Sequence, residues 1–270
     1  MQRLLYFTTE KKVGETPLVA LERGRLAHGI PSDIPLAYAG RLDPMASGKL
    51  LILVGEECKV QEKYHAFQKE YKVELLFGIA SDSGDVLGIT TAHTPTTISD
   101  EAIRTLFSKL RGPIELPYPH FSSKTIQGKP LHTWALESRL NEIEIPIKKS
   151  TILKLVFNEL KTVSKSDLLK SVSAKIETIP PVTDARKALG QDFRRTDVRA
   201  SWSKIEENPT LEYQILSFTC IASSGTYMRS LGEHIAESLG THGLAYSIHR
   251  TKMGSYLPIW KNYGLWIKQF

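Results

Sequence analysis

The sequence predicts an α+β protein that folds as one large domain or as one domain with a sizeable insertion. Hydrophobic residues make up 41% of its 270 residues and charged residues 24%, which is typical of globular proteins and unlike disordered or collagenous chains. Segments with the two-residue period of strands alternate along the chain with segments at helical spacing. Both kinds of element are therefore expected to share one core.

The N-terminal part is expected to contain a helix, a loop and a buried strand. Thr16–Pro17 suits the N-cap and first position of a helix that ends near Gly29. The leucines of its expected apolar stripe are Leu18, Leu21 and Leu26. Residues 31–48 are rich in proline and glycine, which predicts a loop, and KLLILVG after it predicts a strand. The loop therefore delivers Asp43 beside a sheet.

Strands and helices alternate through the rest of the chain. Residues 71–77 alternate with one wholly apolar face, which indicates a strand, and SDSGDVLG after them indicates a turn. Residues 103–110 have helical spacing. Further strands are expected at 152–157 and 216–220, and SSGTYMRSLGEHIAESLG is expected to form a helix that Gly240 ends.

Residues 161 to about 210 form a predicted basic helical insertion. This stretch holds ten Lys or Arg and seven Asp or Glu, a net charge of +3, and its helical spacing is interrupted by Pro180–Pro181 and Gly190. One interpretation is that its basic side chains bind RNA phosphates; the candidates are Arg186, Lys187, Arg194, Arg195 and Arg199. The alternative is a solvated helical excursion that covers the sheet.

Composition and termini exclude several classes of protein. No apolar run approaches the roughly 18 residues of a membrane helix, and MQRLLYFTTEKK lacks the apolar stretch of a secretory signal. Cys58 and Cys220 stand alone, without a CxxC or a histidine pair at metal-ligand spacing. We therefore expect a cytoplasmic protein with no structural metal. Its net charge of +6 makes a polyanionic partner worth testing at each basic cluster.

Three side chains could carry chemistry. Asp43 lies between Gly40 and Gly48, and the proline after it disfavours helical backbone, so its carboxylate either faces a cleft or caps a turn. Arg229 near a helix start could clamp an anion, or it is an ordinary surface arginine. Tyr71 is either a core aromatic or a tyrosine whose buried hydroxyl needs a partner.

Five segments, in order, resemble the TruB-type pseudouridine synthases. AYAGRLDPMASGKLLILVGEECK is similar to the catalytic motif, in which a glycine and one variable residue precede Leu-Asp-Pro. The other four are KEYKVELLFGIASDSGDVLG, PYPHFSSKTIQGKPLHTWAL, CIASSGTYMRSLGEHIAESLG and AYSIHRTKMGSY. Together they cover most of residues 12–160 and 211–256. The resemblance implies an α+β fold with a mixed, mainly antiparallel sheet and a central cleft, to which the insertion is added.

The resemblance also implies roles for individual residues. Asp43 matches the catalytic aspartate, which attacks ribose C1′ in a nucleophilic mechanism or removes a proton from C2′ in a glycal mechanism. Tyr71 matches the catalytic tyrosine that packs on the flipped uracil and is implicated in proton removal at C5. Arg229 matches the arginine that pairs with the carboxylate. The substrate-binding positions implied in the same way are Tyr38, Arg41, Lys124, Ile248 and Arg250.

The chemistry of uridine isomerisation requires such a set. The N1–C1′ bond breaks and a C5–C1′ bond forms with no net redox change and no donated group, so no cofactor is expected. A base in helical RNA must first be extruded at a cost of a few kcal/mol, which stacking on an aromatic side chain partly offsets. An arginine beside the aspartate favours the ionised carboxylate that both mechanisms need.

The chain departs from the family pattern at three places. Tyr38 stands where the family commonly has a histidine that fills the gap left by the flipped base. Arg41 replaces a small or hydroxyl residue, and it either contacts a phosphate or pairs with an acidic neighbour. Only residues 257–270 follow Tyr256, so we expect no C-terminal RNA-binding PUA domain.

These observations predict one catalytic domain over residues 1–270 that acts on structured RNA as a monomer, without metal or membrane. The first expected substrate is the T-loop uridine of tRNA. The alternatives are a uridine at another position of tRNA or ribosomal RNA, or a non-catalytic RNA-binding or RNA-folding factor on the same fold. The joint presence of Asp43, Tyr71 and Arg229 favours an enzyme, because simple binding does not need all three in one pocket.

Overall fold

A computed structural model describes residues 4–179, 194–260 and 263–270. The strands of its main sheet are β1 (Tyr6–Lys11), β2 (Leu36–Ala39), β3 (Ala46–Val54), β4 (Gln68–Phe77), β7 (Gly112–Pro117), β10 (Ile147–Ser164), β11 (Glu212–Ala222), β12 (Gly243–Trp260) and β13 (Tyr263–Gln269). Two short hairpins join β5 (Ile79–Ser81) to β6 (Thr90–Ala92) and β8 (Thr125–Ile126) to β9 (Lys129–Pro130).

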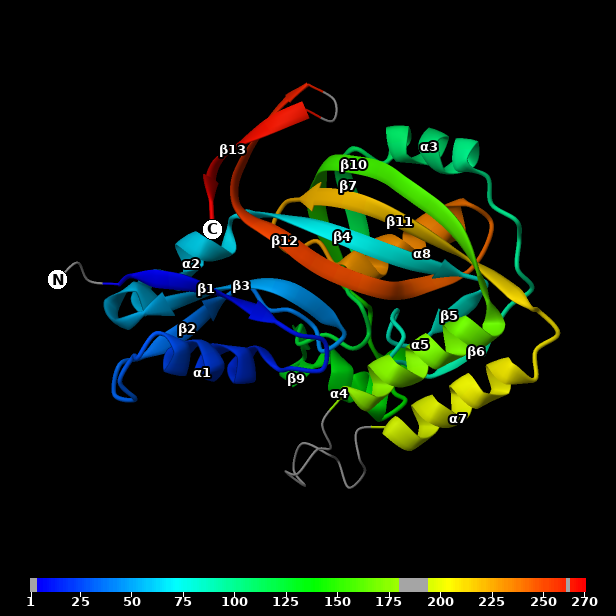
Figure 1. The fold of residues 1–270 in the computed structure, drawn as a ribbon, viewed down its shortest axis with the longest axis horizontal. Coiled ribbons are helices and arrows are strands. Elements are labelled where there is room, and N and C mark those ends of the chain that lie inside the picture. The colour runs from blue at the N-terminus through cyan, green and yellow to red at the C-terminus, as the bar shows by residue number, and fades with distance from the viewer. Residues whose placement is uncertain (1–3, 180–193, 261–262) are drawn as a thin grey trace.

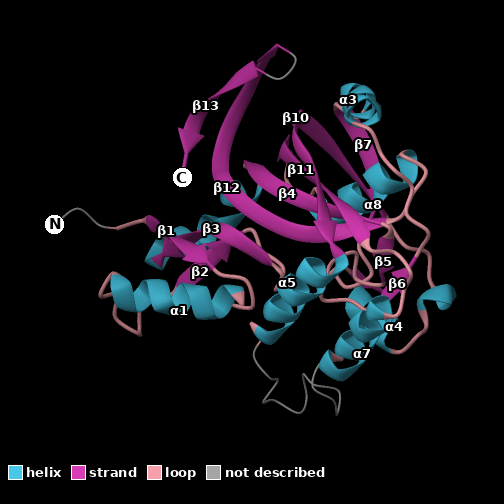
Figure 2. Ribbon diagram, turned by 45° about the vertical axis from the view of Figure 1, so that its right-hand side comes forward, coloured by secondary structure: helices cyan, strands magenta, loops and turns pink. Residues whose placement is uncertain are grey.

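Helices surround this sheet (Figure 1). They are α1 (Pro17–Ala27), α2 (Gln61–His65), α3 (Asp100–Lys109), α4 (Leu131–Leu136), α5 (Lys165–Glu177), α7 (Arg195–Glu206) and α8 (Met228–Ser238), with 3-10 turns η1 (Gly55–Val60) and η2 (Leu140–Glu142). Figure 2 shows α5 and α7 side by side below the sheet, at the end where β5 and β6 lie.

The predicted sheet type is confirmed. Within the described residues, the main sheet has the order β1-β3-β12-β4-β11-β10-β7, with β13 on β12 and β2 on β3. All of its pairs are antiparallel except β12 with β3, whose parallel register runs from Ile248↔Ala46 to Arg250↔Gly48. This short parallel join connects β1, β2, β3 and α1 to the larger part of the sheet.

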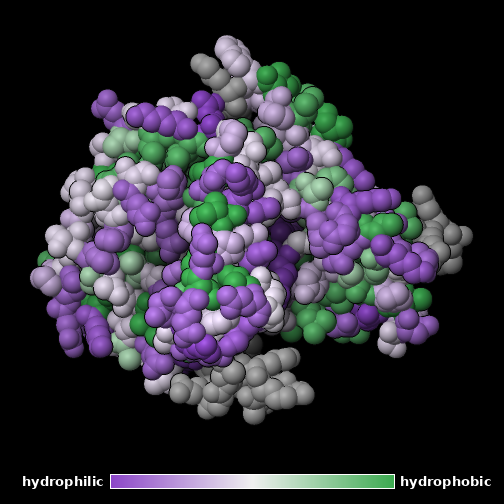
Figure 3. Space-filling model, turned by 180° about the vertical axis from the view of Figure 1, so that it is seen from behind, coloured by the Kyte–Doolittle hydropathy of each residue, from purple (hydrophilic) through white to green (hydrophobic). Residues whose placement is uncertain are grey.

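The described residues form three apolar cores, of which one packs Tyr64 of α2 and Met253 of β12 against Leu51 and Leu53 of β3. The other two lie on either side of the parallel join. The larger one is built on the central strands, where Val73, Leu75 and Phe218 are fully buried. The smaller one packs α1 against β1 and β3 through residues such as Phe7 and Leu21. The face turned away from the viewer in Figure 1 is hollowed between a smaller and a larger lobe, and hydrophilic residues line the hollow (Figure 3).

The first helix forms where the sequence predicts it, but its buried face is different. The Thr16 side chain caps it by accepting a hydrogen bond from the Val19 amide at 3.2 Å. Leu18 and Leu26 of the expected stripe are 61% and 81% exposed. The helix rests so closely on β1 that a Cβ at Gly24 would lie 2.5 Å from the Phe7 ring. Small residues therefore face the sheet, and the expected leucine stripe is wrong at these two positions.

Other boundaries also differ from those expected. The loop predicted over residues 31–48 contains β2, a four-residue strand too short to show a period. Residues 161–164 of the predicted insertion are the end of β10, and the insertion then forms α5 and α7. Pro180–Pro181 and Gly190 lie outside the described residues. Among the helices described, none has the length and apolar character needed to cross a membrane.

Candidate active site

The loop between β2 and β3 presents Asp43 at the protein surface. Its neighbours Leu42 and Met45 are 5% and 3% exposed and belong to the main core, whereas the Asp43 side chain is 36% exposed. Apolar anchors on both sides thus fix the loop while the carboxylate stays accessible. The Leu-Asp-Pro-Met sequence therefore encodes an anchored loop and does not require Asp43 to cap a turn with its side chain.

Two buried cations support the backbone of this loop. Lys11 is fully buried, and its Nζ donates to the carbonyl oxygens of Pro44 at 3.3 Å and Ala46 at 2.6 Å. Arg250, 1% exposed, donates from Nη2 to the Gly40 carbonyl at 3.1 Å and from Nε to the Lys49 carbonyl at 2.7 Å. Carbonyls on both sides of Asp43 are thus held from beneath.

Arg229, in the first turn of α8, is the partner of Asp43. Its Nε and Nη2 both lie 2.9 Å from Oδ2 of Asp43. Nη1 donates to the Ser83 carbonyl at 2.7 Å, and Nη2 also donates to the Phe121 carbonyl at 3.1 Å. The side chain is 3% exposed, so its orientation is fixed. The predicted pairing of Arg229 with Asp43 is present in the structure.

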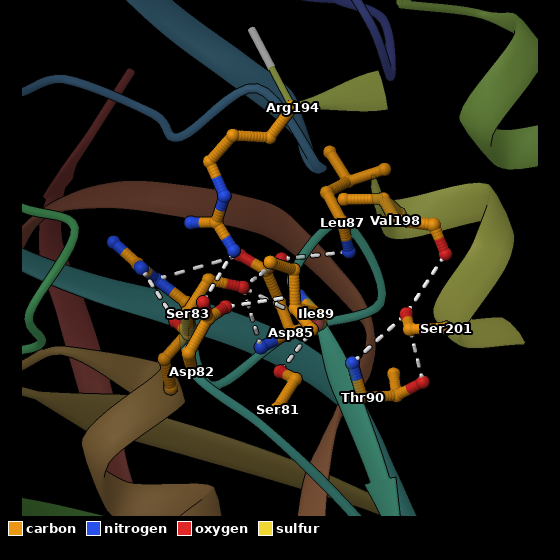
Figure 4. A network of polar contacts seen from close by, with 11 residues as sticks. Ser81, Asp82, Ser83, Asp85, Leu87, Ile89, Thr90, Arg194, Val198 and Ser201 are labelled. Carbon is orange, nitrogen blue, oxygen red and sulfur yellow. Dashed lines mark hydrogen bonds and ion pairs between the residues drawn. The ribbon is translucent and has the colours of Figure 1, made fainter. Parts of the chain in front are cut away.

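A second carboxylate near Arg229 is that of Asp85, in the turn drawn in Figure 4. Its Oδ2 is 3.7 Å from Arg229 Nε, and its Oδ1 accepts hydrogen bonds from Ser83 Oγ and the Leu87 amide, each at 2.9 Å. Burial raises the pKa of Asp85. Burial alone would lower the pKa of Arg229, but the charges of Asp43 and Asp85 raise it. The guanidinium therefore stays charged between one accessible and one buried carboxylate.

Tyr71 on β4 lies within electrostatic reach of this pair. Burial raises the pKa of the Tyr71 hydroxyl, the charge of Asp43 raises it further, and a hydrogen bond with Arg250 lowers it. In the sheet, Tyr71 is directly opposite Arg250 of β12 and Cys220 of β11. Asp43 thus contacts Arg229 directly and its charge acts on the Tyr71 hydroxyl, although the three residues come from separate parts of the sequence.

The implied substrate-binding residues lie in different environments. Arg41 and Lys124 are exposed, and Lys124 Nζ lies 5.5 Å from the centroid of the Tyr118 ring. Ile248 is 4% exposed within the main core. Tyr38 is half-buried against the core under α1, and Arg250 is occupied with loop carbonyls. Direct contact of these five residues with a substrate stays a prediction.

The described arginines of the insertion are paired with carboxylates. Arg194 forms an ion pair with Asp82, and Arg195 and Arg199 both pair with Glu177 of α5, at 3.6 and 2.7 Å. Arg186 and Lys187 lie outside the described residues. Contact between any of these side chains and RNA remains a prediction.

Three buried charged residues near the site, Lys11, Lys69 and Asp85, were not among the residues predicted from the sequence. Lys11 occupies an inward position of β1, whose exposure alternates strictly, so strand periodicity extended to the first strand would have shown a lysine facing the core. Asp85 lies in the polar turn SDSGDVLG, where only a partner 144 positions away, Arg229, distinguishes it from Asp82. Lys69 precedes Tyr71 by two residues and so shares its strand face.

Lys69 is expected to make the stability of the protein depend on pH. It is 5% exposed and donates to the His65 carbonyl at 2.8 Å and Ser224 Oγ at 3.2 Å. Burial, and then the charge of Arg250, lowers its pKa from 10.5 to about 7. Between these two pH values the unfolded chain binds more protons than the folded chain, so the free energy of unfolding rises with pH. Lys11, whose pKa burial lowers to about 8, acts in the same direction.

Urea unfolding at pH 6.5 and pH 9 measures this effect. The native chain should be more stable at pH 9, and Lys69→Met should reduce the difference. Lys72→Met is the matched control, because Lys72 is exposed on the same strand. An equal pH dependence in native chain and Lys69→Met would contradict the role given to Lys69.

The fold is shared with a solved structure, and part of the sequence is similar to a known family. The fold matches a chain in "Crystal Structure of a Cbf5-Nop10-Gar1 Complex" with a TM-score of 0.55 and 14% identity, covering 93% of this chain and 49% of that one. Residues 35–163 match the family described as TruB family pseudouridylate synthase (N terminal domain). Over these residues, just under half of the chain, the sequence is similar to the TruB family.

Relatives come from bacteria and from yeast. The protein named tRNA pseudouridine synthase B in Caldicellulosiruptor saccharolyticus is 27% identical over 82% of this chain and 58% of its own length. The protein of the same name in a Marinomonas species is 26% identical over 92% of this chain and 63% of its own length. The protein named tRNA pseudouridine synthase 4 in Saccharomyces cerevisiae is 28% identical over 77% and 58%. The chain thus spans less than two thirds of the length of these relatives.

Proposed function

We propose that this protein is a pseudouridine synthase that isomerises the T-loop uridine of tRNA. The observation that carries the proposal is the accessible carboxylate of Asp43, held by the buried Arg229. The names of the relatives, which are tRNA pseudouridine synthases, support the reaction and the class of substrate. A non-catalytic RNA-binding factor would not require a buried guanidinium to orient a single exposed carboxylate.

The geometry assigns a task to each oxygen of Asp43. Arg229 contacts Oδ2 with two nitrogens, so Oδ1 is the oxygen presented to the ribose. From there it attacks C1′ or removes the C2′ proton, and in both cases the N1–C1′ bond breaks. The electron pair of that bond goes to the uracil, which is retained in the site. Asp85 offsets part of the guanidinium charge, and the backbone supports from Lys11 and Arg250 keep the carboxylate in position.

The uracil must then turn so that C5 faces the sugar. Stacking on the ring of Tyr71 stabilises the extruded base and limits the ways it can rotate. The C5–C1′ bond forms as the Asp43–C1′ ester breaks or, in the glycal route, as the proton returns to C2′. The C5 proton is lost to solvent and N1 gains a proton, so that the product is an isomer of the substrate. The raised pKa of Tyr71 keeps its hydroxyl neutral at neutral pH, which suits a stacking side chain with a hydrogen-bonding edge.

Release of tritium from uracil C5 tests this proposal. A tRNA transcript that carries [5-³H]uridine should lose tritium to water when it is incubated with the native protein. A matched transcript with cytidine in place of the T-loop uridine should lose none. Release that persists from the second transcript would show that another uridine is the target. If neither transcript nor total cellular RNA releases tritium, the proposed reaction is wrong.

A further inference from the structure

Arg194, immediately before α7, joins two segments that hold the active-site arginine. Its guanidinium forms an ion pair with Asp82 and lies 4.4 Å from the centroid of the Phe121 ring. The side chain is 15% exposed. Figure 4 shows it reaching from the start of α7 to the turn that contains Asp82 and Ser83. This contact connects the insertion to the catalytic part of the fold.

Asp82 and Phe121 are next to the groups that orient Arg229. Arg229 Nη1 donates to the carbonyl of Ser83, the residue after Asp82, and Nη2 donates to the carbonyl of Phe121 itself. Because these two acceptors lie in different segments of the chain, the direction of the guanidinium depends on their separation. The Arg194 guanidinium contacts both segments on the outer side: it pairs with the Asp82 carboxylate of one and stacks on the Phe121 ring of the other.

The remainder of α7 fixes the same turn at two further points. Ser201 Oγ accepts hydrogen bonds from the amide and the hydroxyl of Thr90, at 3.0 and 3.1 Å. The indole of Trp202 donates to the Val86 carbonyl at 3.0 Å. The Asp82 carboxylate in turn accepts from the Ile89 amide at 2.9 Å, which closes the turn. The turn is thus held at Asp82 by Arg194 and at Val86 and Thr90 by α7.

These contacts distinguish RNA binding by the insertion from internal support of the fold by the insertion. An arginine that binds an RNA phosphate has its guanidinium free for the phosphate oxygens, and Arg194 would have to leave both Asp82 and Phe121 to do so. The polar contacts of Ser201 and Trp202 are buried, and a helix that only shields the sheet from water does not need them. The geometry therefore favours a structural role, in which Arg194 and α7 stabilise the turn from Asp82 to Thr90.

We propose that Arg194 is a positioning residue for the reaction at Asp43. It holds the Asp82–Ser83 turn and Phe121 as one frame around Arg229, and Arg229 in turn orients the Asp43 carboxylate. This proposal rests on the proposed function for its effect on the reaction rate, but the frame itself can be observed without activity.

Kinetics and RNA binding together test the proposal. Arg194→Gln should lower kcat for tritium release about tenfold, because small misplacements of catalytic groups cost one to two orders of magnitude. The Kd for the tRNA transcript and its dependence on salt should not change. Asp82→Asn should give a similar loss, and the double variant should be no worse than either single one, because the two side chains act as a unit. Arg194→Lys should recover part of the rate.

Arg104→Gln is the matched control, since Arg104 also stacks on a phenylalanine, Phe157, at 4.2 Å, but on α3. It should leave kcat unchanged. A raised Kd for Arg194→Gln, with a log–log salt slope reduced by about one, is the sign of a lost phosphate contact, and with an unchanged kcat it would overturn the proposal. A loss of kcat in Arg194→Gln that Asp82→Asn does not share would also overturn it.

A spectroscopic measurement separates failure of this proposal from failure of the proposed function. The Nε–H NMR signal of Arg229 should shift in Arg194→Gln and remain in place in Arg104→Gln. If the native protein releases no tritium and the signal shifts as expected, the proposed reaction fails and the frame stands. If the signal and kcat are both unchanged in Arg194→Gln, the frame is wrong whatever the protein catalyses.

Discussion

Replacing Asp43 with asparagine is expected to lower tritium release from uracil C5 by about three orders of magnitude or more, with RNA binding kept within about twofold. Asparagine has nearly the same shape, and its amide oxygen can still accept the hydrogen bonds of Arg229. It can neither attack C1′ nor remove a proton from C2′. Because Asp43 is 36% exposed and its loop is anchored by Leu42 and Met45, the fold should be retained.

Single-turnover release with excess protein, combined with filter binding, measures the two quantities separately. Asp33→Asn is a suitable control, since Asp33 is an exposed acid in the segment before β2 and should behave like the native chain. Equal release from Asp43→Asn and the native chain would refute the mechanism. If tritium release is lost because RNA binding is weaker, Asp43 has a role in RNA recognition and not in catalysis.

Replacing Arg229 with glutamine is expected to destabilise the protein by about 3–5 kcal/mol as well as inactivate it. The guanidinium serves two carboxylates and two backbone carbonyls from a position that is 3% exposed. Glutamine offers two donors and no charge, so Asp85 would be left buried without its cation. Urea unfolding at pH 7 would show the loss as a lower midpoint with an unchanged slope.

The contribution of the buried carboxylate can be isolated by a second substitution. If Asp85 carries most of the cost, Asp85→Asn added to Arg229→Gln should restore about 1–2 kcal/mol, because it removes the unpaired charge. The same Asp85→Asn change in the native background should destabilise. Additive losses in the double variant would show that the two side chains are not coupled as the 3.7 Å distance implies.

Local patterns in the sequence predicted elements better than they predicted contacts. Strand periodicity located β4 and β11, because inward and outward positions alternate there. On α1 the same reasoning misplaced the buried face, since the close approach of Phe7 to Gly24 is set by tertiary packing. The composition of the insertion indicated helices, but it could not show that Arg194 pairs with Asp82.

The active centre could be predicted only through the family resemblance. Asp43 and Arg229 lie 186 positions apart, and neither carries a local signal that distinguishes it from a turn cap or a surface arginine. The two supports beneath the loop, Lys11 and Arg250, lie at opposite ends of the chain and meet only in the folded sheet. Their roles depend on the positions of backbone carbonyls, which side-chain patterns do not encode.

The place of β12 in the sheet has a consequence for biosynthesis. This strand, residues 243–260, lies between β3 and β4 and contributes Arg250 beneath the Asp43 loop. During translation the first three strands and α1 can collapse early, whereas the strand that joins them to β4 leaves the ribosome only after β4, β7, β10 and β11 have been made. Such pairing across most of the sequence is slow to form, because a large loop must be closed. A nascent chain that has not yet reached Gly243 therefore carries Asp43 without the scaffold that makes it reactive.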